Sequence, residues 1–146
     1  MNRILNKKLN KMSKNIIVIG ASNSSQSINR QLANYAASKL NDVSLNQIDI
    51  AGYNETKMFS ADYAQEVPSE ILELKETFNK ADGFIISFAE HNGSYTAAYK
   101  NVIDWISVQE GKVFNGKPVL LLATSPGPRG GANVLATSNM YYPHIG

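Results

Sequence analysis

The 146-residue sequence contains no cysteine and only two histidines. The absence of cysteine excludes disulfides, thiolate metal sites, iron–sulfur clusters and cysteine nucleophiles. Two histidines are too few for a typical zinc site, so we expect no metal centre. Any chemistry must come from hydroxyls, carboxylates, backbone groups or a bound cofactor.

Long apolar runs are also missing. The longest purely apolar stretch is a handful of residues, and the N-terminus lacks the apolar core and the small-residue cleavage site of a secretory signal. We therefore expect a cytoplasmic protein with no membrane partner. A hydrophobic content of 43% and a charged content of 18% are ordinary for one globular domain of this length.

The net charge of +2 is concentrated at the N-terminus, where the first fourteen residues contain no acid. Their basic residues are Arg3, Lys7, Lys8, Lys11 and Lys14. Such an arm could bind nucleic acid or membrane, but terminal segments are usually loose, and Met12 could be an alternative initiator. Because no aromatic-plus-basic pattern follows, we expect a disordered tail over residues 1–13, a single domain over residues 14–146, and no nucleic-acid partner.

A strand-to-helix junction over residues 15–29 organises the rest of the chain. The β-branched run at residues 16–19 ends at Gly20, and a loop rich in hydroxyl and amide side chains follows. Helical periodicity begins after Ser27, which is well placed as the N-cap. The free N–H groups and the positive dipole end of such a helix attract anions. The junction predicts a bound phosphate, although the serines could also serve only to cap the helix.

Strand and helix patterns alternate along the remaining chain. Apolar or alternating segments predict strands at residues 43–50, 84–88 and 119–123. Helical spacing predicts helices that begin after Ser27, at Pro68, at Thr96 and near Ala132. Residues 51–67 have no convincing period and are expected to form a long loop. This alternation indicates βαβ units with right-handed crossovers and a parallel sheet.

Helical spacing also predicts which side chains face the core. The expected inward residues of the first helix are Ile28, Leu32, Tyr35, Ala36 and Leu40. Those of the second are Ile71, Leu72, Leu74, Lys75 and Phe78. In the third, Ala98, Val102, Trp105 and Ile106 are expected inward, and Lys100, Asn101, Asp104 and Ser107 largely outward.

Three of the four strands end in polar loops that contain glycine: residues 20–27, 89–94 and 124–131. In open α/β sheets, ligands bind outside the carboxyl ends of the strands. We therefore expect these three loops to converge on one site.

The three loops together resemble the NADPH-dependent FMN reductase family of flavodoxin-like proteins. Residues 21–29 match its motif Gly-Ser-x-Arg-x-x-Ser-x-Asn, and residues 89–94 match Pro-Glu-Tyr-Asn-Gly-Ser. The helix motif Leu-Lys-Asn-x-x-Asp-Trp is matched by residues 99–105, and the third loop by residues 124–131. Ser24 stands at the position of the family's arginine, and Ala89 and His91 at those of its proline and tyrosine.

The resemblance implies a flavodoxin-like three-layer α/β/α sandwich with a parallel sheet in the order 2-1-3-4. Members of the family usually continue through a fifth strand and helix beyond the position of Gly146. The fifth strand is therefore expected to be missing or truncated, which leaves the fourth strand as an exposed edge unless a partner covers it.

By the same resemblance, the first loop holds the phosphate of FMN and the other two loops hold its isoalloxazine ring. The cofactor-binding residues implied are Ser22, Ser24, Ser27, Ile28, Asn29, Glu90, His91, Asn92, Gly93, Ser94, Thr124, Ser125, Pro126, Gly127 and Gly130. No catalytic side chain is implied, because hydride transfer through a flavin needs no protein acid.

The implied function is an FMN-dependent oxidoreductase that passes a hydride from NADPH or NADH through the flavin to a small acceptor, such as a flavin, quinone or azo compound. Family members commonly form dimers or tetramers with the flavin near the interface, and a homodimer or homotetramer is expected here. The alternatives are a flavodoxin-like electron carrier and a flavin- or nucleotide-binding domain without reductase activity.

Four features admit a structural explanation beside a functional one. Glu90 and His91 could form an acid–base pair, but loop residues that offer backbone contacts are the better interpretation. Lys100 and Asp104, four residues apart on a helix, favour a surface ion pair. Trp105 is more often a core or dimer contact than a cofactor stack. The remaining cation for an anion contact is Arg129, which could equally be solvated.

Overall fold

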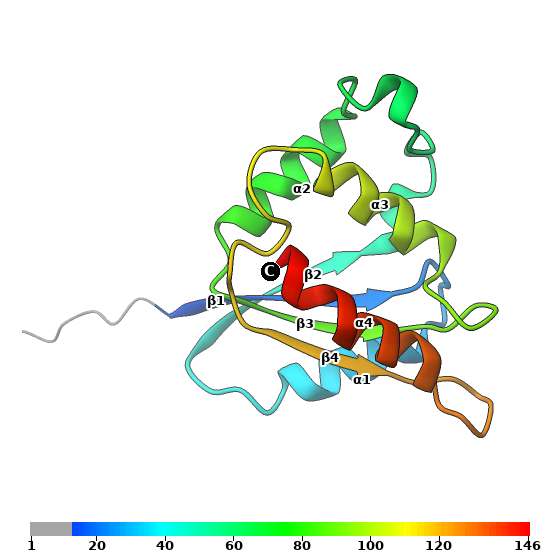
Figure 1. Cartoon of the computed structure of the whole chain (residues 1–146). Helices are drawn as coiled ribbons and strands as arrows, with labels where there is room; N and C mark the ends of the chain where they lie inside the picture. Colours follow the sequence, from blue (N-terminus) through cyan, green and yellow to red (C-terminus); the bar gives the residue numbers. More distant parts are fainter. Residues whose placement is uncertain (1–12) are drawn as a thin grey trace, which may run out of the picture.

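The computed structural model describes residues 13–146 and shows strands and helices in regular alternation (Figure 1). The strands are β1 (Lys14–Ala21), β2 (Val43–Asp49), β3 (Gly83–Phe88) and β4 (Val119–Ala123). The helices are α1 (Ile28–Ala37), α2 (Ser69–Asn79), α3 (Ala97–Ser107) and α4 (Ala132–Ile145). Every predicted strand and helix is confirmed, although α1 ends at Ala37, three residues before the predicted inward residue Leu40. The predicted tail lies outside the described residues except for Ser13.

The four strands form one parallel sheet in the order β2-β1-β3-β4, which confirms the predicted topology. β3 is buried along its whole length, and β1 from Ile17 onward, because helices cover both faces of these central strands. The chain leaves β1 toward β2 and then crosses to β3 on the other side of β1. The strand order therefore reverses between β1 and β3, which is where open α/β sheets bind ligands.

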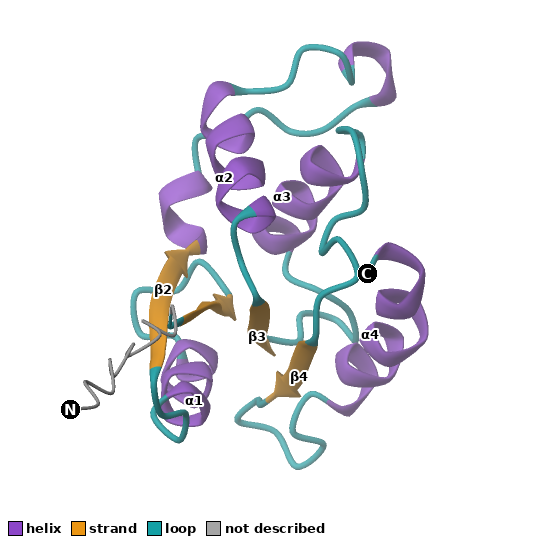
Figure 2. Ribbon diagram, turned by 90° about the vertical axis from the view of Figure 1, so that its left-hand side faces the viewer, coloured by secondary structure: helices purple, strands orange, loops and turns teal. Residues whose placement is uncertain are grey.

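The helices cover the two faces of the sheet unequally: α2, α3 and α4 lie on one face and α1 on the other (Figure 2). The larger core, between the sheet and the three helices, is rich in aromatic side chains. Its fully buried aromatic members are Trp105, Tyr99, Phe78, Phe84, Phe88 and Phe114. The smaller core is formed by Val18, Ile85, Ala33 and Ala37 beneath α1. Within the described part of the chain, no helix has the length and apolar character needed to cross a bilayer.

The predicted inward face of α1 is largely wrong, although Ala36 is half-buried against the smaller core. The helix buries Asn29, Ala33 and Ala37, whereas Tyr35 is 63% exposed, and Ile28 and Leu40 are also exposed. The cause is the close approach of the helix to β1 at Gly20. A Cβ atom on Gly20 would lie 2.5 Å from the Cα atom of Arg30. So short a separation leaves room only for small side chains under the helix.

Two smaller corrections concern the other helices. Leu72 of α2 is 48% exposed although it was expected inward, while the rest of that predicted face is buried. Asn101 of α3 was expected outward and is buried. The predicted loop at residues 51–67 is partly ordered as two single-turn 3-10 helices, η1 (Ile50–Tyr53), which begins one residue before it, and η2 (Ala61–Tyr63).

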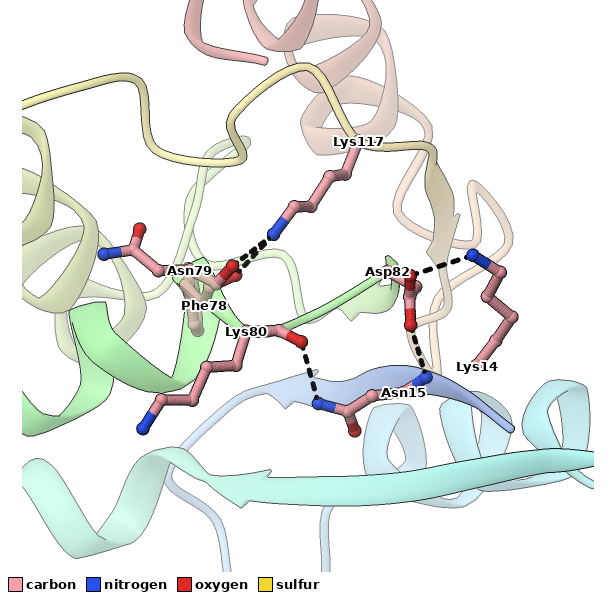
Figure 3. A network of polar contacts seen from close by, with 7 residues as sticks. All are labelled: Lys14, Asn15, Phe78, Asn79, Lys80, Asp82 and Lys117. Atoms are coloured by element: carbon pink, nitrogen blue, oxygen red, sulfur yellow. Dashed lines mark hydrogen bonds and ion pairs between the residues drawn. The ribbon is translucent and has the colours of Figure 1, made fainter. Parts of the chain in front are cut away.

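A polar network joins β1 to the turn between α2 and β3, at the amino ends of the strands (Figure 3). The Asp82 carboxylate accepts hydrogen bonds from the backbone N–H of Asn15 at 2.8 Å and from the Lys14 ammonium at 3.0 Å. Both contacts hold the pKa of Asp82 below its ordinary value. Lys117 donates to the carbonyl oxygen of Asn79 at 2.6 Å, where α2 ends. A cation there stabilises the negative end of the helix dipole.

Candidate cofactor site

Three loops meet at the carboxyl ends of β1, β3 and β4: the first loop (residues 22–27), the second loop (89–96) and the third loop (124–131). They enclose a cavity of about 280 Å³. It is lined by Ser22, Ser24, Gln26, Ser27, Ile28, Asn29, Ala89, Glu90, His91, Thr124, Ser125 and Pro126. The expected convergence is therefore observed. The lining does not include Asn92, Gly93, Ser94, Gly127 and Gly130.

In the first loop, serine side chains accept hydrogen bonds from nearby backbone N–H groups. Ser22 Oγ accepts from Ser24 at 3.2 Å, and Ser24 Oγ accepts from Gln26 at 3.2 Å. Ser27 Oγ accepts from Arg30 at 3.1 Å and caps α1, as predicted. Because each oxygen accepts from the backbone, each hydroxyl hydrogen remains available to a ligand. The loop can thus present three neutral donors to an anion.

The start of α1 adds backbone donors to these hydroxyls. The first N–H groups of a helix have no partner within it, and the helix dipole is positive at this end. No acidic residue lies in the first turn of α1, so nothing there opposes a bound anion. Free donors and an uncompensated dipole match what a phosphate group requires, and the residues present therefore fit the phosphate end of FMN.

Neither Arg30 nor Arg129, the two arginines considered for an anion contact, lines the cavity. The Arg30 guanidinium donates to the carbonyl oxygen of Ser25 at 2.5 Å and lies 3.4 Å from the Asp49 carboxylate. Arg129 is exposed on the third loop and does not line the cavity. The hydroxyls and the helix start are therefore the groups at the first loop that are available to bind an anion.

The Asn29 amide, which the sequence suggested as a phosphate donor, is occupied by protein groups. Its Nδ2 donates to the carbonyl oxygen of Thr124 at 3.0 Å. Its Oδ1 accepts from Ser87 Oγ at 2.7 Å and from the backbone N–H of Thr124 at 3.1 Å. Asn29 is only 2% exposed, and both its amide oxygen and its amide nitrogen are bonded to protein groups, so it offers the cavity mainly its backbone N–H.

The second loop turns back on itself as a two-residue hairpin. His91 and Ser94 exchange backbone hydrogen bonds of 3.0 and 3.1 Å. Between them, Asn92 and Gly93 have φ angles of 51° and 80°. A turn with two positive φ angles requires residues such as asparagine and glycine. The Asn-Gly pair therefore shapes the loop from outside the cavity, while His91 reaches the cavity wall.

Glu90 is engaged with α4, not with His91. Its carboxylate accepts a hydrogen bond of 3.0 Å from the backbone N–H of Val134 in the first turn of α4. The preceding Gly131 has no side chain to cap that helix. Glu90 supplies the missing cap from another loop, which favours the structural interpretation of this residue over an acid–base pair.

The helix motif on α3 anchors the segment at residues 51–67. The buried Asn101 amide accepts a hydrogen bond from the Phe59 N–H at 2.8 Å, and Trp105 Nε1 donates to the Lys57 carbonyl oxygen at 2.7 Å. Tyr63 stacks on Trp105 with ring centroids 6.2 Å apart. Trp105 is thus a core residue. Sequence periodicity missed Asn101, because a polar amide is expected at the surface and its burial depends on backbone partners that periodicity does not reveal.

A second cavity, of about 550 Å³, lies between α3 and α4 and was not predicted. Its lining is Ser94, Tyr95, Tyr99, Lys100, Ile103, Asp104, Thr137, Met140, Tyr141, Tyr142 and His144. The hydroxyls of Tyr99 and Tyr142 form a buried hydrogen bond, and burial raises the pKa of both groups well above the ordinary value. Lys100 and Asp104 form the predicted ion pair at 2.6 Å on its rim.

Comparison with known proteins gives one consistent result. Residues 14–145 match the model of the NADPH-dependent FMN reductase family. A quinone reductase of Escherichia coli (strain K12) is 39% identical over 77 residues, which are 51% of this chain and 41% of that protein. An NAD(P)H-dependent FMN reductase of Pseudomonas aeruginosa is 31% identical over 86 residues, covering 58% of this chain and 46% of the relative. These matches span less than half the length of either relative.

Among solved structures, FerB, a flavoenzyme NAD(P)H:(acceptor) oxidoreductase from Paracoccus denitrificans, has a TM-score of 0.76 with this chain. The two sequences are 26% identical, and the match covers 91% of this chain and 72% of FerB. The sheet and its helices therefore have the arrangement found in a known flavoenzyme.

Proposed function

Because this chain belongs to the NADPH-dependent FMN reductase family, we propose that it is an oxidoreductase that uses bound FMN to reduce a small acceptor at the expense of NADPH or NADH. The observation that carries the proposal is the convergence of three loops on one cavity, with hydroxyl donors and a helix start at one side. The names of its relatives support a flavin, a quinone or a similar small compound as the acceptor.

The first loop would hold the phosphate. The hydroxyls of Ser22, Ser24 and Ser27 and the first N–H groups of α1 would donate to its oxygens. Charge-assisted hydrogen bonds of this kind are about twice as strong as those between neutral groups. Several such donors can replace the arginine that the family motif has at the position of Ser24.

The second and third loops would hold the ring. Ala89, Glu90, His91, Ser125 and Pro126 line the same cavity from the second and third loops. The turn residues Asn92 and Gly93, with Ser94, Gly127 and Gly130, would act by setting the path of these loops. When bound, FMN supplies the hydride-transfer chemistry itself. The protein's contribution is to hold the cofactor in a fixed orientation with one side accessible, and no side chain is assigned an acid or base role.

A charge substitution in the first loop tests this placement. Ser27→Asp keeps a side chain that caps helices well but brings negative charge to the proposed phosphate position. We expect FMN affinity, measured by quenching of flavin fluorescence, to fall by about 100-fold or more, because a carboxylate repels the phosphate and a donor is lost. Ser25→Asp adds the same charge at an exposed position outside the cavity lining and should weaken binding by less than about fivefold, because water surrounds an exposed carboxylate and weakens its repulsion. Equal losses in both variants would contradict the placement.

We also propose a homodimer, or a homotetramer built from it, that buries the cavity between α3 and α4. Met140 at its edge is 72% exposed and Tyr141 is 43% exposed. Exposed apolar patches around a hollow mark interaction surfaces. A two-fold axis pairs such a patch with itself, and Lys100 and Asp104 give the rim charges of both signs. A second copy is therefore a suitable occupant.

We place the reaction in the cytoplasm, where reduced nicotinamide cofactors are plentiful.

A further inference from the structure

One buried or half-buried side chain joins each pair of the three cofactor loops, or the elements that directly flank them. Thr96, which is 1% exposed, donates from Oγ1 to the carbonyl oxygen of Ala21 at 3.1 Å and so joins the second loop to the end of β1. Asn29 joins the start of α1 to the third loop, and Glu90 joins the second loop to the start of α4. We call these the three interloop contacts.

The third loop depends on two of these contacts. At its beginning, the Asn29 amide bonds both the N–H and the carbonyl group of Thr124. At its end, the Glu90 carboxylate accepts from the N–H of Val134. Between these points, residues 126–129 are exposed. The loop is therefore held near its two ends by a side chain from the first turn of α1 and one from the second loop.

Asparagine is the residue type that the first of these positions requires. The amide must donate to the Thr124 carbonyl and accept from the Thr124 N–H and from Ser87 Oγ at the same time. An aspartate at this position could accept but could not donate, and its charge would face a carbonyl oxygen. Glu90 has a simpler requirement, because any planar group with an acceptor oxygen at the same reach can bond Val134.

We propose that Asn29 and Glu90 are positioning residues that fix the third loop at a set distance from the first and second loops before any cofactor arrives. The proposal rests on the proposed function, since it is the separation of these loops that would match the flavin. It assigns both side chains to the loop framework. Binding would then require little reorganisation of the protein, which lowers its entropic cost.

Limited proteolysis of the cofactor-free protein tests the contacts directly. Arg129 places a trypsin site, the Arg129–Gly130 bond, in the exposed middle of the third loop. Glu90→Ala and Asn29→Asp should each speed cleavage of this bond about tenfold, because proteolysis follows the population of the opened loop. Cleavage after Lys75, which is 4% exposed within α2, requires that helix to unfold and reports global unfolding in the same digest. A rise at both bonds in proportion would overturn the proposal.

Conservative and neighbouring variants sharpen the result. Glu90→Gln keeps an acceptor oxygen for Val134 and should restore cleavage to within about threefold of the parent protein. Asn133→Ala removes an exposed neighbour in the same turn of α4 and should leave the rate unchanged. If Glu90→Ala were cleaved no faster than Asn133→Ala, Glu90 would not hold the loop.

An FMN titration of the same variants separates this proposal from the proposed function. Glu90→Ala should weaken FMN binding at least fivefold, and Glu90→Gln should recover most of the loss. If the parent protein binds no FMN, the proposed function fails while the digest still reports on the loop. If FMN binds normally to Glu90→Ala and its cleavage rate is unchanged, the positioning role is refuted and the proposed function stands.

Discussion

Gly20 determines how closely α1 can approach the sheet. A side chain there would meet the backbone of Arg30, with the added Cβ atom 2.5 Å from its Cα and 2.6 Å from its nitrogen. The same short distance explains why Ala33 and Ala37 form the buried face of the helix. One glycine thus sets the position of the helix start that we assign to the phosphate.

Gly20→Ala should therefore affect both stability and cofactor binding. Backbone atoms must shift to admit the methyl group, so the free energy of unfolding should fall by about 1–3 kcal/mol. FMN affinity should fall with it, because the shift moves the first turn of α1. Urea denaturation and fluorescence titration measure the two effects.

Gly52→Ala is the matched control, since its added Cβ would have no heavy atom within 4 Å and its φ angle is ordinary. It should change stability by less than about 0.5 kcal/mol. If both variants were equally stable, close packing at Gly20 would not determine the position of α1.

At the scale of the elements, Asp82 joins the start of β1 to the turn between α2 and β3 (Figure 3). The Asn15 N–H and the Lys14 ammonium depress its pKa in the folded protein. A carboxyl group with a depressed pKa contributes stability that is fully present above its ordinary pKa of 3.8. That contribution disappears as the pH falls through the folded-state pKa, because the unfolded chain then binds the proton more readily.

Asp82→Asn should consequently be less stable than the parent protein at neutral pH, with a difference that shrinks as the pH is lowered from about 5 toward 2. Denaturant titrations across this range measure the free energy of unfolding of both proteins. Asp62→Asn, at an exposed carboxylate on η2, serves as the control. A difference between parent and Asp82→Asn that stays constant with pH would show that the carboxylate charge is not responsible.

Element boundaries could be predicted from the sequence because their signals are local. Ser27 caps α1, Thr96 caps α3, and both cap bonds are present in the structure. The buried face of α1 could not be predicted this way. Helical periodicity ranks side chains by their polarity, whereas the burial of Ala33 and Ala37 follows from the short distance between the helix and β1 at Gly20. Asn101 shows the same limit, since its burial depends on backbone groups more than forty positions away.

At the scale of the whole molecule, some parts of the site could be predicted from the sequence and others only from the three-dimensional structure. Alternating strands and helices predicted a parallel sheet, and the loops at its carboxyl ends predicted the cavity. The resemblance added the strand order and the cofactor. The bonds of Asn29 and Glu90 could not be anticipated, because their partners lie 95 and 44 positions away. The cavity between α3 and α4 likewise has no local sequence signal.

The proposed subunit interface at the cavity between α3 and α4 can be tested by substitution. Met140→Glu would bring a charge into the proposed subunit interface and should convert an oligomer to monomers, as measured by analytical ultracentrifugation. Leu72→Glu changes an exposed leucine on α2, outside the cavity lining, and should leave the assembly intact. A parent protein that is monomeric at high concentration would refute the proposed homodimer.

The most direct test of the proposed reductase activity is an anaerobic titration of the FMN-loaded protein with NADPH or NADH, followed by visible absorbance. We predict that about one equivalent of reduced nicotinamide abolishes the absorbance of oxidised flavin, and that a quinone restores it. Bound FMN that stays oxidised would contradict the reductase and support an electron carrier. A protein that gains no flavin absorbance on addition of FMN would contradict both.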